Sequence, residues 1–61
     1  MSKLKAMRES KGLSQKELSK ETGIRQATIS EIETGKAKDT WISTYKKLAE
    51  YFKCTIDELV D

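Results

Sequence analysis

The feature that most constrains the fold of this 61-residue chain is the segment 12–36, GLSQKELSKETGIRQATISEIETGK. Ser14 and Glu17 have the spacing of a capping box (S-x-x-E), which predicts a helix that begins directly after Ser14. Gly23 offers the positive φ with which that helix ends and the chain turns within about three or four residues. A second helix is expected over Gln26–Thr34. The segment therefore predicts two short helices that cross steeply at a tight turn.

The rest of the chain predicts three further helices around this pair. We expect them over residues 2–11, over residues 41–52 and, as a short fifth helix, after the second capping box of Thr55 and Glu58. Proline is absent and glycine occurs three times, at positions that punctuate helices. We predict one all-α domain of five helices spanning residues 1–61, with a core at helical spacing formed by Leu4, Met7, Leu13, Leu18, Ile29, Ile32, Ile42, Tyr45, Leu48, Ala49, Phe52, Ile56 and Leu59.

Composition excludes several classes of function. One cysteine, Cys54, and no histidine leave no internal disulfide and no Cys/His zinc pattern, so we expect no metal and no cofactor. Cys54 is expected to be a half-buried thiol between helices. An enzyme is not expected, because the chain lacks a paired nucleophile and base, a phosphate-cradling glycine loop and room for a pocket. Without a long apolar run, we expect a soluble, cytoplasmic protein that spans no membrane.

The helix over Gln26–Thr34 has two chemically different sides. At about 100° per residue, Ile29, Ile32 and Thr28 fall on one side. The opposite arc, about 140° wide, carries short polar or small side chains: Gln26, Ala27, Ser30, Glu31 and Thr34. A protruding helix of this kind fits the major groove of DNA, which is about 12 Å wide. We predict base contacts by Gln26 with adenine, Ala27 with a thymine methyl, Glu31 with cytosine N4 and Ser30 with any base.

Phosphate contacts are predicted around this face. The residues that border it and can donate to phosphate oxygens are Gln15, Arg25, Thr28, Thr34, Lys36 and Lys38. Charge is distributed accordingly: residues 1–38 carry nine Lys/Arg and five Glu, whereas residues 39–61 carry three Lys and five Asp/Glu. We interpret Lys46-Lys47 as a solvated face.

Residues along nearly the whole chain resemble the phage-repressor/Cro-like (lambda-repressor-like) helix-turn-helix domains. The resemblance is carried by Met7–Gln15 (MRESKGLSQ), Leu18, Gly23-Ile24, Ile29-Ser30, Ile32–Lys36 (IETGK), Leu48-Ala49 and Thr55–Leu59 (TIDEL). It implies that Gln26, Ala27 and Glu31 read bases and that Gln15 and Thr28 contact phosphate. It further implies that Arg8 and Glu33 form an ion pair.

The same resemblance implies a homodimer through the fourth and fifth helices. Such a dimer binds a near-palindromic duplex, with half-sites about 34 Å apart. The candidate dimer contacts are Tyr51, Cys54, Val60 and Trp41.

Four departures from the family pattern leave alternatives open. Ser19 stands where alanine is usual, which predicts either a looser crossing or an extra hydrogen bond, and Arg25 stands where a capping side chain is expected. Glu31 stands where arginine or glutamine is frequent, so it either specifies cytosine or weakens DNA binding. The loop over residues 35–41 is about one residue longer than usual and lacks proline.

Two functions from different classes follow from the sequence. The leading hypothesis is a sequence-specific regulator of transcription, with repression as the predicted activity, that binds double-stranded DNA. The alternative is a protein-interaction module, such as an antitoxin or an adaptor, on the same fold.

Overall fold

The computed structural model describes residues 2–36 and 42–60, which form four α-helices and one turn of 3₁₀ helix. The elements are α1 (Lys3–Ser10), α2 (Gln15–Thr22), α3 (Gln26–Thr34), α4 (Ile42–Phe52) and η1 (Ile56–Glu58). The all-α class is confirmed, and the described ends of α1 to α4 lie within about one residue of the predicted ends. Trp41, the predicted first residue of the fourth helix, lies outside the described residues.

The predicted fifth helix is instead the single 3₁₀ turn η1. The Glu58 amide donates to the Thr55 carbonyl at 3.2 Å, and the Leu59 amide donates to the Ile56 carbonyl at 2.9 Å. Both bonds span three residues, and short pieces of this length are where the tighter helix is most common. Glu58 Oε1 accepts from the Thr55 amide at 3.5 Å, as a capping box requires, and from the Thr55 hydroxyl at 3.2 Å. The start of the element was therefore predicted correctly and its type was not.

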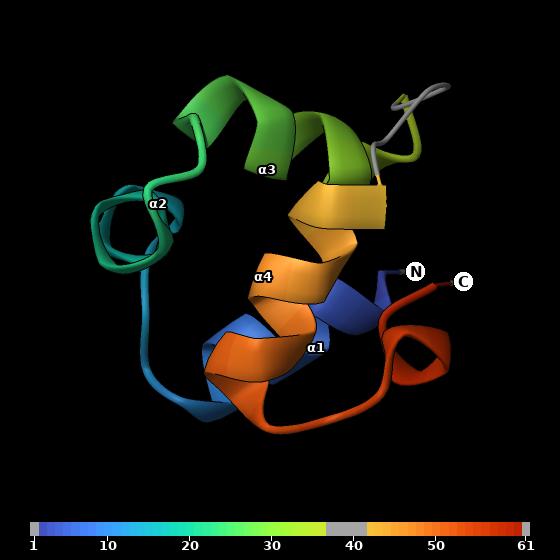
Figure 1. Cartoon of the computed structure of the whole chain (residues 1–61). Coiled ribbons are helices and arrows are strands. Elements are labelled where there is room, and N and C mark those ends of the chain that lie inside the picture. Colours follow the sequence, from blue (N-terminus) through green and yellow to red (C-terminus); the bar gives the residue numbers. More distant parts are fainter. Residues whose placement is uncertain (1, 37–41, 61) are drawn as a thin grey trace.

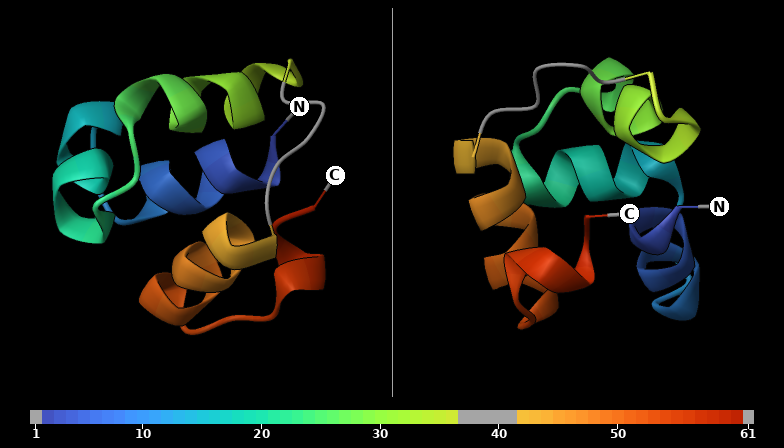
Figure 2. Two further views of the ribbon diagram at one scale, coloured as in Figure 1. Left: turned by 45° about the horizontal axis from the view of Figure 1, so that its top comes forward. Right: turned by 90° about the vertical axis from the view of Figure 1, so that its right-hand side faces the viewer.

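The four helices place α3 at one surface of the molecule. Figure 1 shows α3 across the top, α2 beside its first turn, and α1 and α4 below it. In the right-hand view of Figure 2, α2 passes beneath α3 with its first turn on the side away from α4, which lies to the left of α3. The chain measures 26 × 22 × 22 Å along its principal axes. None of the other described elements covers the upper side of α3.

The core takes one fully buried aliphatic side chain from each element or its flank: Leu4, Leu18, Ile29, Leu48 and Leu59. Burying such a side chain contributes about 1.5–3 kcal/mol. The same core includes Ile24, Ile32, Ala49 and Phe52, and half-buried apolar side chains pack around it: Met7, Leu13, Tyr45, Tyr51, Cys54 and Ile56. A domain this small buries only about 60% of its unfolded surface, so each of these positions matters to its stability.

Ile42 was predicted to lie in the core, and this prediction is wrong. Its side chain is 77% exposed, whereas Leu48, Ala49 and Phe52 of the same helix are buried. Ile42 is the first residue of α4, and at about 100° per residue it falls at the edge of the apolar stripe. It therefore precedes the turns of α4 that pack against the core.

Candidate nucleic-acid interface

The turn between α2 and α3 fixes how α3 leaves the body of the molecule. Gly23 ends α2 with a φ of 75°, and its amide donates to the Ser19 carbonyl at 2.8 Å. The Ser19 hydroxyl donates to the Ile24 carbonyl, and the Thr22 hydroxyl donates to the Leu18 carbonyl at 2.8 Å. Of the two alternatives left open for Ser19, the structure therefore has the extra hydrogen bond at the crossing.

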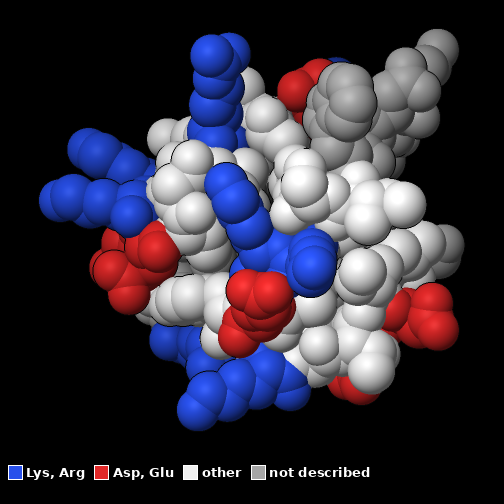
Figure 3. Space-filling model, in the orientation of Figure 1, with Lys and Arg blue, Asp and Glu red and all other residues white. Residues whose placement is uncertain are grey.

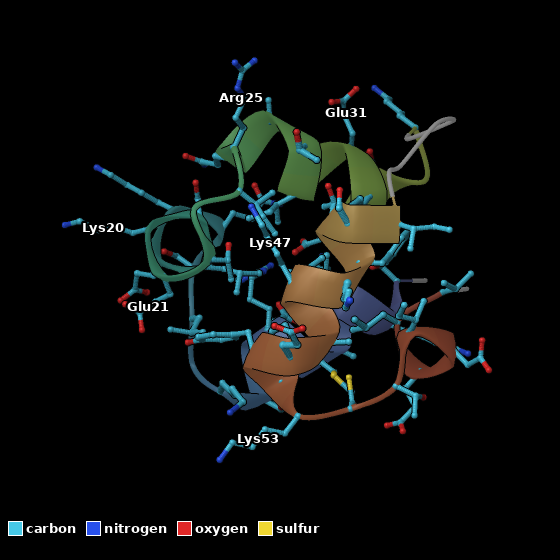
Figure 4. The ribbon with its side chains drawn as sticks, viewed as in Figure 1. Lys20, Glu21, Arg25, Glu31, Lys47 and Lys53 are labelled. Atoms are coloured by element: carbon cyan, nitrogen blue, oxygen red, sulfur yellow. The ribbon has the colours of Figure 1, made fainter. Side chains whose placement is uncertain are left out.

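The apolar side of α3 is buried, and its polar side is exposed or half-buried. Ile29 and Ile32 are buried and anchor the helix in the core. On the opposite side, three of the residues predicted to contact bases are exposed, namely Gln26, Ala27 and Glu31, and Ser30 is half-buried. In Figure 4 the labelled side chains of Arg25 and Glu31 point away from the body of the molecule. The outer side of α3 therefore presents short polar groups to solvent.

The start of α3 lacks a side-chain cap. Ser2 and Ser14 accept hydrogen bonds from backbone amides at the starts of α1 and α2, but Arg25 makes no such bond at the start of α3. The first turn of α3 also contains no acidic residue. A helix N-terminus carries about half a positive charge, to which the exposed Arg25 guanidinium adds. This end of α3 is therefore electropositive.

The remaining residues predicted to contact phosphate differ in availability. Thr28 is half-buried and Lys36 is exposed, whereas Lys38 lies outside the described residues. Thr34 is exposed, but its hydroxyl donates to the Ser30 carbonyl at 2.9 Å. A hydroxyl has one proton to donate. A phosphate contact by Thr34 would therefore require its hydroxyl to rotate away from the helix.

Arg8 and Glu33 join α1 to the end of α3. The Arg8 Nε and Nη2 atoms donate to Glu33 Oε2 and Oε1 at 2.7 Å and 3.1 Å, which makes the pair bidentate. The Arg8 Nη1 atom donates to the Leu13 carbonyl at 2.5 Å, just before α2. The two side chains are only 10% and 3% exposed. This pair therefore ties the end of α3 to α1 and to the loop that precedes α2.

Gln15 is bound to the same carboxylate. Its Nε2 atom donates to Glu33 Oε1 at 3.1 Å. The sequence singled out Gln15 as a phosphate donor but gave no sign of this bond, because the two residues are 18 positions apart and no local pattern links them. The amide keeps a second N–H for another acceptor.

The charge state of Glu33 is set by this network. Burial disfavours its ionised form, but hydrogen bonds from Arg8 and Gln15, with the charges of Arg8 and Lys5, outweigh burial and hold the pKa of Glu33 below its ordinary value. The hydrogen bond to Glu33 raises the pKa of Arg8. Both shifts favour the charged forms, so the ion pair persists at neutral pH.

We expect acid to weaken the fold through Glu33. A carboxyl group with a depressed pKa contributes stability that is present above its unfolded-state pKa, about 4.3, and is lost as the pH falls through its folded-state pKa. The free energy of unfolding, measured by urea denaturation from about pH 6 to about pH 3, should therefore fall more steeply in the wild type than in Glu33→Gln, which cannot titrate at this position. Parallel curves for the two proteins would exclude this role.

Charged side chains surround the outer side of α3. Figure 3 shows Lys and Arg side chains at the top, left, centre and bottom of this face, with acidic groups between them. Within residues 2–36 and 42–60, no group of three or more His, Cys, Asp or Glu side chains could hold a metal ion. No helix in the same ranges is long and apolar enough to cross a membrane.

Comparison with known proteins places the chain in a family. The model of the helix-turn-helix family matches residues 4–59, which include all described helices except the first residue of α1. No curated protein sequence and no solved structure matches the chain significantly. The chain therefore belongs to the lambda repressor/Cro-like helix-turn-helix family, a family of DNA-binding regulators.

Proposed function

We propose that this protein is a sequence-specific repressor of transcription that reads the major groove of double-stranded DNA with α3. One observation carries the proposal: α3 turns short polar side chains to solvent while Ile29 and Ile32 anchor its other side in the core. Small side chains let a helix backbone approach base edges within a groove about 12 Å wide. The hydrogen-bonded turn at Gly23 holds α3 at the surface, where it can enter such a groove.

Each exposed group on α3 has a chemically matched base. The Gln26 amide can bind adenine N6 and N7 together, the Ala27 methyl can contact thymine, and the Glu31 carboxylate can accept from cytosine N4. Ser30 tolerates any base. Phosphate oxygens beside the groove would be bound by Gln15, Arg25, Thr28, Thr34, Lys36 and Lys38, and these contacts would fix the register.

We also propose that two copies bind one near-palindromic site through contacts between α4 and η1. A single recognition helix reads only a few base pairs, so a dimer is needed for tight binding. Two exposed large apolar side chains in the described part of the chain, Ile42 at 77% and Val60 at 42%, belong to α4 and to the residues after η1. Tyr51 and Cys54 are half-buried, and Trp41 lies outside the described residues.

Salt dependence tests DNA binding directly. Three cationic contacts in each protomer, Arg25, Lys36 and Lys38, give a dimer about six, so affinity for a duplex should fall roughly 10³-fold between about 50 mM and about 200 mM salt. Fluorescence anisotropy with labelled duplexes of random sequence measures this. If no duplex is bound at about 50 mM salt, the DNA proposal fails and the alternative protein-interaction module, which the exposed Glu31 carboxylate favours, takes its place.

A further inference from the structure

The basic side chains of α4 form a surface that the predicted phosphate contacts do not include. Lys46 and Lys47 are exposed on the middle of α4. Within the described ranges, neither Lys47 nor Arg25 has a carboxylate within 4.0 Å of its charged nitrogen atoms. Figure 4 shows the Lys47 side chain extending from α4 towards the turn between α2 and α3, below Arg25. Figure 4 therefore places two cations near the start of α3, Arg25 above it and Lys47 of α4 below it.

On the α4 side of α3, a helix bound in the major groove would meet a phosphate backbone that Gln15 does not reach. A helix in the major groove has a phosphate backbone along each of its two sides. Helix α2 passes beneath α3, and its first turn, which begins at Gln15, lies on the side away from α4 (Figure 2). Gln15 can serve only the strand on its own side. Lys47 is the exposed cation in the middle of α4 that extends towards the start of α3 on the α4 side (Figure 4).

We propose that Lys47, together with Arg25, binds the phosphate backbone of the DNA strand that runs along the α4 side of α3. The proposal rests on the proposed function and extends its footprint from α2 and α3 to α4. Charge complementarity selects this occupant, because an exposed ammonium beside an electropositive helix start attracts a polyanion. Glu50 is the nearest acidic residue in sequence, and it lies one turn further along α4, which runs away from α3 (Figure 1).

Lys47→Gln and Lys53→Gln form a matched pair that tests this surface. Both lysines are exposed and each substitution removes one positive charge, but Lys53 follows the far end of α4 and points away from α3 (Figure 4). We expect Lys47→Gln to reduce the slope of log K against log salt by about 0.9 in magnitude for each protomer, and to weaken binding at low salt several-fold on all duplex sequences. Lys53→Gln should leave the slope at its wild-type value. Circular dichroism melting checks that both variants fold.

The outcomes separate this proposal from the proposed function. If the wild type binds duplex DNA and the two variants have equal slopes, the Lys47 contact is overturned and the proposed function stands. If the wild type binds no duplex at low salt, both are overturned. If Lys47→Gln changes binding to one base sequence only, Lys47 contacts a base edge, and the phosphate contact is overturned.

Discussion

Glu33→Ala is expected to destabilise the protein by about 3 kcal/mol or more, because it leaves the Arg8 guanidinium buried without its carboxylate. The substitution also removes the acceptor of the Gln15 amide. A domain of 61 residues has a free energy of unfolding of only about 3–9 kcal/mol. The destabilisation by Glu33→Ala is therefore a large part of the total stability. Thermal melting followed by circular dichroism should show the melting temperature lowered by more than about 10 °C, with a share of unfolded protein already at room temperature.

Glu31→Ala is the matched control. It removes the same charge from the same helix. The Glu31 side chain, however, is exposed and makes no hydrogen bond within residues 2–36 and 42–60. Its melting temperature should stay within about 3 °C of the wild type. If Glu33→Ala has the same melting temperature as this control, the prediction fails, and the Arg8–Glu33 pair does not stabilise the packing of α3 on α1.

Glu31 is expected to determine which base the protein prefers at the DNA position that faces the middle of α3. In the wild type, replacing the cytosine whose N4 amino group donates to Glu31 should cost about 1–3 kcal/mol of binding free energy. In Glu31→Ala the same replacement should cost close to nothing, because no acceptor for cytosine N4 remains. Affinity for non-specific duplexes should rise at the same time, since a negative charge beside phosphates is removed. Competition binding with single-base variants of a selected site measures both effects.

Glu21→Ala controls for the change of net charge. Glu21 is exposed on α2 and points away from α3 (Figure 4), so its loss should leave the preference for cytosine intact. A cytosine preference that survives in Glu31→Ala would show that Glu31 reads no base. Glu31 would then be only a repulsive charge on the face, the second of the two roles that the sequence left open for it.

Local patterns account for what the sequence predicted well. The bounds of α2 follow from the Ser14–Glu17 capping box and from Gly23, and the end of α3 follows from Gly35, because these residues satisfy helix ends within their own turn. The two sides of α3 follow from helical periodicity alone. The fully buried residues Leu18 and Ile29 were predicted on the same ground.

What the sequence did not predict depends on contacts between elements. Ile42 has the periodicity of a core residue, but whether the first turn of α4 is covered is decided by its neighbours. The bond from Gln15 to Glu33 joins residues that only the crossing of α2 and α3 brings together. Lys47 is exposed, as the sequence predicted, and our proposal that it binds a phosphate depends on where the fold places α4 relative to α3.

The most direct test of sequence-specific DNA reading by α3 is selection of bound duplexes from a random library, followed by sequencing. We predict an enriched inverted repeat whose half-sites lie about 34 Å apart, each with an adenine, a thymine and a cytosine at fixed positions that face Gln26, Ala27 and Glu31. Bound duplexes without any enriched sequence, or no bound duplex at low salt, would contradict this reading.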